Sequence, residues 1–147
     1  MLKRGVLLAM VMSLAACGGV DPDSPLGKRK AIFKEMLNVS EDLGGMLRGR
    51  LAYDEQAFIE KSAHLDALAK KPWQHFPAIQ EDERNSARDE VWQEQERFQE
   101  LARALEQTTA HLVLSTTEPP LNKSVLAVRV QAVEDACESC HTEFRAY

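Results

Sequence analysis

The chain has 147 residues, of which 44% are hydrophobic and 28% charged, which suits one domain with a charged surface. Its formal net charge of −5 argues against binding to nucleic acid or to anionic lipid. Only two Tyr, two Trp and five Phe are present, and the Gly and Pro residues occur in clusters. Long helices are therefore favoured over many short strands.

The first seventeen residues have the pattern of a bacterial export signal. Lys3 and Arg4 give a positive start, and the apolar run 6–14 is too short to span a bilayer. The segment ends in Leu14-Ala15-Ala16-Cys17-Gly18, which resembles the lipobox of bacterial lipoproteins. In such proteins the peptide is cut before the Cys, which is then acylated. The alternative is ordinary export with an incidental Cys.

Residues 1–17 are thus predicted to be a signal segment, and Cys17 a lipid anchor to a membrane on its periplasmic side. The resemblance implies the outer membrane, because Gly18 and not Asp follows the Cys. Removal of Lys3 and Arg4 leaves the mature chain two charges more negative, so a redox partner protein is expected to be basic. Residues 18–25 are acidic and contain Pro, which is typical of a tether.

Four helical stretches are predicted between residue 26 and the C-terminus. The first spans 26–48 and has apolar residues at the helical period: Ile32, Phe33, Met36, Leu37, Leu43, Met46 and Leu47. The second follows Asp54, a candidate N-cap, and ends at Pro72. Its apolar residues are Phe58, Ile59, Leu65 and Leu68.

A polar connection over 72–85 precedes the third predicted stretch, 86–114. That stretch carries Val91, Phe98, Leu101, Ala102, Leu105 and Leu112 at helical spacing. Pro119-Pro120 separates it from a fourth stretch, whose face includes Leu126, Val130, Val133, Cys137, Cys140, His141 and Phe144. Four amphipathic helices of similar length predict an all-α fold, an antiparallel four-helix bundle over 26–147.

The fourth stretch contains the motif Cys137-Glu138-Ser139-Cys140-His141. On a helix, positions i, i+3 and i+4 share one face, so both thiols and the imidazole project together. This pattern predicts one covalent haem c near the C-terminus, with thioether bonds to Cys137 and Cys140 and His141 as an axial ligand of the iron. The third cysteine, Cys17, is expected to carry the lipid, which would leave none for a disulfide.

Two other interpretations of the motif are weaker. A dithiol redox pair normally opens a helix in a βαβ setting, and no such setting is predicted here. A zinc site needs a second Cys/His pair, whereas His64, His75 and His111 are isolated in the sequence.

The chain resembles the cytochrome c-prime family. Phe144-Arg145 matches the aromatic-Arg pair that follows the haem motif there, and Pro72-Trp73 with Phe76 resembles the Pro-Trp segment of that family. Six residues of the first helical stretch and the turn after it also fall at the family's spacings: Arg29, Gly44, Met46, Gly49, Tyr53 and Asp54. The resemblance covers essentially the whole mature chain.

The resemblance implies which residues lie opposite His141. Low-spin members carry a Met ligand four residues after the Arg of the first helix, and here Phe33 takes that place. An apolar residue there implies high-spin, five-coordinate iron. Met36 is the alternative sixth ligand if the register slips by a turn, although Met at helical spacing usually fills the core. His64, His75 and His111 are weaker candidates.

Other site residues follow from the same resemblance. Arg29 would pair with a haem propionate, and Arg145 would shape the proximal face. Lys30 stands where relatives commonly have Gln, and it is interpreted as a solvated charge. Trp92 would pack near the haem or in the core. Relatives often form homodimers through the first helix.

The leading functional hypothesis is a haem protein that binds nitric oxide or carbon monoxide, transfers single electrons, or does both. A second is a low-spin electron carrier ligated by Met36. A third is a haem-free structural lipoprotein with an accidental motif. No nucleophile with its base and no phosphate-binding loop is evident, so an enzyme is not predicted.

Overall fold

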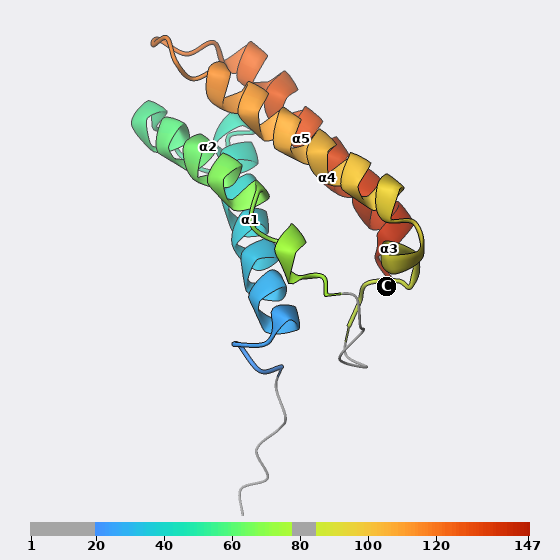
Figure 1. Cartoon of the computed structure of the whole chain (residues 1–147). Helices are drawn as coiled ribbons and strands as arrows, with labels where there is room; N and C mark the ends of the chain where they lie inside the picture. The colour runs from blue at the N-terminus through green and yellow to red at the C-terminus, as the bar shows by residue number, and fades with distance from the viewer. Residues whose placement is uncertain (1–19, 78–84) are drawn as a thin grey trace, which may run out of the picture.

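The computed structural model describes residues 20–77 and 85–147. Its elements are α1 (Pro25–Leu47), α2 (Glu55–Ala69), the 3-10 helix η1 (Trp73–His75), α3 (Glu90–Gln93), α4 (Gln95–Leu114) and α5 (Lys123–Phe144). The four long helices form a bundle in which α1 packs on α2 and α5, and α4 packs on α2 and α5. The start of α1 and the C-terminus lie at the same end (Figure 1). None of the described helices is both long and apolar enough to cross a membrane.

Helix boundaries follow from capping residues. The Ser24 side chain accepts a hydrogen bond from the Gly27 N–H, and Pro25 occupies the first turn, so α1 begins one residue earlier than predicted. Asp54 caps α2 as expected, with its Oδ1 2.8 Å from the Ala57 nitrogen. Gly49 follows α1 with φ +74°, a conformation that other residues rarely adopt and that turns the chain toward α2.

The prediction of the third helix is wrong in two respects: the helix begins later than predicted, and it is interrupted between α3 and α4. Residues 86–88 are extended, and Ala87 forms an antiparallel bridge with Arg145. The helical conformation also breaks at Glu94 (φ −115°, ψ 51°), between α3 and α4. There the Gln95 side-chain amide donates to the Val91 carbonyl, in place of the backbone N–H that an unbroken helix would use.

The buried side chains form two clusters. The main core joins all four long helices and includes Leu43, Phe58, Leu65, Leu112, Leu126 and Val133. The second cluster consists of Val91, Phe98, Leu101 and Phe144. All six apolar residues predicted for the third stretch are buried. The prediction for Leu37 is wrong: this residue is 57% exposed, whereas Met36 and Val39 are buried.

Candidate haem-binding site

The Cys-x-x-Cys-His motif lies in the last two turns of α5, at the end of the bundle where α1 begins (Figure 1). Cys137, Cys140 and His141 are all half-buried. Cys137 packs against the main core and Cys140 against the second cluster, and Trp73 of η1 contacts both clusters. The motif therefore lies where the two apolar clusters meet. A flat apolar ring system could pack there against apolar side chains.

Burial favours the protonated thiol form of the two cysteines and the neutral form of the imidazole. Burial raises the pKa of Cys137 to about 11, and the nearby Cys140 and Glu134 add to the effect. Burial and Glu143 raise the pKa of Cys140 to about 11. Burial lowers the pKa of His141, and the positive charge of Arg145 lowers it further. Both cysteines are free thiols, and a neutral imidazole is the form that binds iron.

Phe33 of α1 lies against η1. Its ring contacts Trp73 edge-to-face, with centroids 6.0 Å apart, and Phe76 at 6.4 Å. Like Cys137, Phe33 packs against the main core. Met36, one turn later, is 5% exposed and is a member of that core. The ring of Phe33 is thus held by two aromatic neighbours.

Arg29 is buried one turn before Phe33, with 6% of its surface exposed. Its Nη1 donates to the His75 carbonyl at 2.8 Å and its Nη2 to Asn85 Oδ1 at 2.9 Å. The guanidinium also lies 4.6 Å above the centre of the Phe76 ring. The neighbouring Lys30 is exposed, which agrees with its interpretation as a solvated charge.

Replacing Arg29 with Met is expected to lower the free energy of unfolding by about 1–3 kcal/mol, because the variant removes the hydrogen bonds that a buried guanidinium donates to the His75 carbonyl and to Asn85 Oδ1. Chemical denaturation of the holoprotein measures the change. The matched control is Lys30→Met, which removes an exposed charge from the same helix and should have little effect. Equal stability of the two variants would contradict a structural role for the Arg29 hydrogen bonds.

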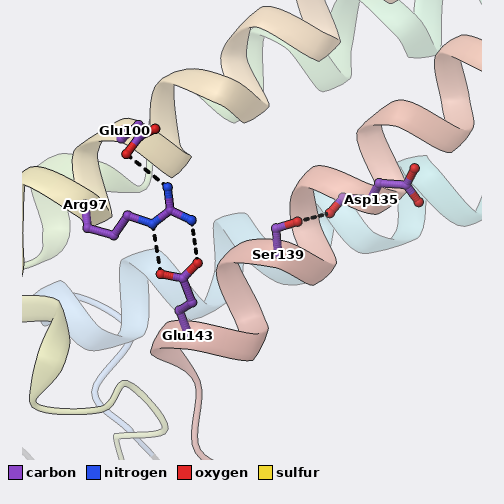
Figure 2. Close-up of polar contacts among 5 residues, drawn as sticks. All are labelled: Arg97, Glu100, Asp135, Ser139 and Glu143. Carbon is purple, nitrogen blue, oxygen red and sulfur yellow. Dashed lines mark hydrogen bonds and ion pairs between the residues drawn. The ribbon is translucent and has the colours of Figure 1, made fainter.

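The residues after His141 are attached to α4 and to the extended segment 86–88. The Arg145 N–H donates to the His141 carbonyl, the Arg88 N–H to the Phe144 carbonyl at 2.9 Å, and the Ala146 N–H to the Ser86 carbonyl at 2.8 Å. Figure 2 shows that Arg97 of α4 binds Glu143 through two hydrogen bonds, of 2.9 and 2.6 Å. The hydrogen bond to Arg97 lowers the pKa of Glu143.

The other histidines and Trp92 take different positions. His64 is exposed, with its Nε2 2.7 Å from Glu35 Oε1, and His111 is exposed on α4. His75 ends η1. Trp92 packs against the second cluster, as Cys140 does, and donates to the Pro77 carbonyl. In the described ranges 20–77 and 85–147, no three His, Cys, Asp or Glu side chains gather to hold a metal ion by themselves.

Two buried polar atoms, one of them on Asn85, which binds Arg29, fit a haem carboxylate. Trp73 Nε1 and Asn85 Nδ2 have no hydrogen-bond partner, although buried donors are nearly always paired. A propionate is an acceptor that could satisfy such groups. Asn85 was not singled out in the sequence; its only signal is the Asx turn, in which Oδ1 accepts from the Ala87 N–H at 3.0 Å.

A four-helix bundle that presents two thiols and an imidazole on one helix face, between apolar clusters, defines a c-type cytochrome. The family model for cytochrome C' matches residues 24–145. The chain belongs to the cytochrome c-prime family, whose members bind one covalent c-type haem.

Two relatives illustrate the similarity. The chain is 29% identical to cytochrome c' of Rhodopseudomonas palustris over 147 residues, which cover 97% of this chain and 96% of the relative. It is 27% identical to cytochrome c' of Halomonas halodenitrificans over 131 residues, covering 86% and 98%.

Solved structures agree in fold. Cytochrome c prime from Shewanella frigidimarina matches with a TM-score of 0.80 and 21% identity, covering 88% of this chain and all of that one. Variants of cytochrome c prime from Alcaligenes xylosoxidans, solved with nitric oxide and with carbon monoxide bound, match with TM-scores of 0.76 and 0.77. Their identities are 21% and 19%, over 88% of this chain and at least 99% of theirs.

Proposed function

We propose that this cytochrome is a high-spin gas-binding protein in which His141 is the only protein ligand of the iron and Phe33 covers the opposite side. The observation that carries the proposal is the packing of Phe33 against Trp73 and Phe76. By the resemblance, this side chain, which has no ligating atom, takes the family's sixth-ligand position. When bound, ferrous haem offers an iron coordination site for nitric oxide or carbon monoxide and can exchange one electron.

Other residues of the chain would attach the haem, bind its propionate and control which ligands reach the iron. Cys137 and Cys140 would form the thioether bonds, and Arg29, with the unpartnered donors of Trp73 and Asn85, would bind a propionate. The Phe33 ring would exclude water and large anions, whereas a small neutral diatomic need only displace the ring. The nitric oxide and carbon monoxide complexes of variants of the Alcaligenes xylosoxidans protein support this proposal.

The alternative is a low-spin electron carrier with Met36 as sixth ligand. Burial of Met36 in the main core favours packing over ligation. Met36→Leu conserves volume and apolarity, so the proposal expects ferric and ferrous absorption spectra like those of the natural protein. A change from a low-spin to a high-spin spectrum in this variant would overturn the proposal and make Met36 the ligand.

We also propose that Cys17, which lies outside the described residues, anchors the protein by a lipid to the periplasmic side of the outer membrane. The natural chain should then sediment with membranes, and Cys17→Ser should be released into the periplasmic fraction, because covalent acyl chains provide the membrane affinity. A haem stain of the two fractions measures the distribution. Retention of Cys17→Ser in membranes would count against the anchor.

The acidic mature chain would suit a basic redox partner.

A further inference from the structure

The last turn of α5 is held from several sides. Phe144 packs inward, edge-to-face on Phe98 of α4, with ring centroids 5.3 Å apart. The Arg88 and Ala146 N–H groups bond the tail to segment 86–88. Arg97 of α4 donates two hydrogen bonds to Glu143, two residues after His141 (Figure 2).

The Arg97–Glu143 contact has the geometry of a two-point clamp. Arg97 Nε and Nη2 donate to the two different oxygens of Glu143, at 2.9 and 2.6 Å. Its Nη1 donates to Glu100, three residues later on α4, at 3.0 Å. A guanidinium held at all three nitrogens fixes both the distance and the orientation of the carboxylate, which a point charge does not.

We propose that Arg97 and Glu143 are positioning residues for His141: their clamp fixes the last turn of α5 on α4 and thereby the orientation of the imidazole toward the haem. The pair is too exposed, at 41% and 36%, to be a main source of stability. Its effect is local, because Glu143 shares a helical turn with His141. The proposal rests on the haem assignment, but not on which ligand, if any, lies opposite His141.

A second ion pair on α5 provides a matched control. Arg48 binds Glu134 at 3.1 Å, with exposed fractions of 48% and 30%, and so ties α5 to the end of α1 one turn before Cys137. The double variants Arg97→Met/Glu143→Gln and Arg48→Met/Glu134→Gln each break the ion pair that ties α5 to another helix, and each leaves the net charge unchanged. The first variant also removes the Arg97–Glu100 pair within α4. Any general consequence of losing an ion pair on α5 should appear equally in both.

The test is proton nuclear magnetic resonance of the ferric holoproteins. Resonances of the His141 ring and Cβ protons are shifted by the iron in either spin state, and their positions depend on the orientation of the imidazole. We expect these resonances to shift or broaden in the Arg97/Glu143 variant and to stay unchanged in the Arg48/Glu134 control. Arg97→Lys keeps the positive charge but loses the two-point hydrogen bonding of the guanidinium. Its His141 resonances should therefore change as they do in the Arg97/Glu143 variant.

Hydrogen exchange of the Arg145 amide, which is bonded to the His141 carbonyl, gives a second readout. Faster exchange is expected in the clamp variant only. Unchanged His141 resonances in the clamp variant, or equal changes in the control, would overturn the inference. Carbon monoxide binding by the natural protein is measured separately, and its absence would refute the proposed gas binding without affecting this result.

Discussion

Replacement of Phe33 with Ala is expected to speed carbon monoxide binding to the ferrous protein by about 10- to 100-fold. Two edge-to-face contacts, with Trp73 and Phe76, hold the ring, and each such contact is worth about 0.5–1.5 kcal/mol. An entering ligand must displace the ring against both, and each 1.4 kcal/mol corresponds to a factor of about ten in rate. Stopped-flow or flash photolysis measures the association rate.

Two further variants make this prediction specific. Leu37→Ala, on the same helix but 57% exposed, should leave the rate unchanged. Phe33→Met should introduce a thioether ligand, convert the spectrum to low spin and slow carbon monoxide binding. Unchanged spectra and rates in both Phe33 variants would show that Phe33 does not cover the iron.

Removal of both thiols, in Cys137→Ala/Cys140→Ala, is expected to abolish covalent haem attachment completely. Thioether bonds can form only through these two side chains among the described residues, whose other positions contain no cysteine. Acidified organic solvent should extract haem from the double variant but not from the natural protein, when both are produced with the haem-attachment machinery.

The control for the thiol variant is Ser139→Ala, which lies inside the motif. Its Oγ donates to the Asp135 carbonyl of its own helix, as Figure 2 shows, so attachment should be normal. A natural protein without colour would contradict the haem assignment and favour the haem-free structural lipoprotein.

Most of the fold could be predicted because its signals are local. Asp54 caps α2, and the apolar periodicity of α5 lies within one helix, so both helices form where these local signals place them. The failures involve distant partners. Ala87 is extended because it pairs with Arg145, and nothing near Ala87 in the sequence indicates that pairing. Leu37 is exposed because the buried face of α1 follows the spacing of Met36, Val39 and Leu43, which leaves Leu37 beside it.

The site divides in the same way. The haem motif is contiguous, so the sequence alone places both thiols and the imidazole on one helix face. The surroundings of Arg29 on α1 could not be predicted in this way, because its hydrogen-bond partners, His75 of η1 and Asn85, are distant in sequence and meet it only in the folded chain. Arg97 and Glu143 are 46 residues apart, and no local pattern connects them. Cys17 lies outside the described residues, so its lipidation stays a prediction.

The most direct test of an open coordination site beneath Phe33 is the ultraviolet-visible spectrum of the purified holoprotein, ferric and ferrous, before and after addition of carbon monoxide. The proposed function predicts high-spin spectra and a shift of the ferrous spectrum when carbon monoxide is added. A low-spin spectrum that carbon monoxide does not change would contradict it, because a sixth ligand, with Met36 the first candidate, would then occupy the site.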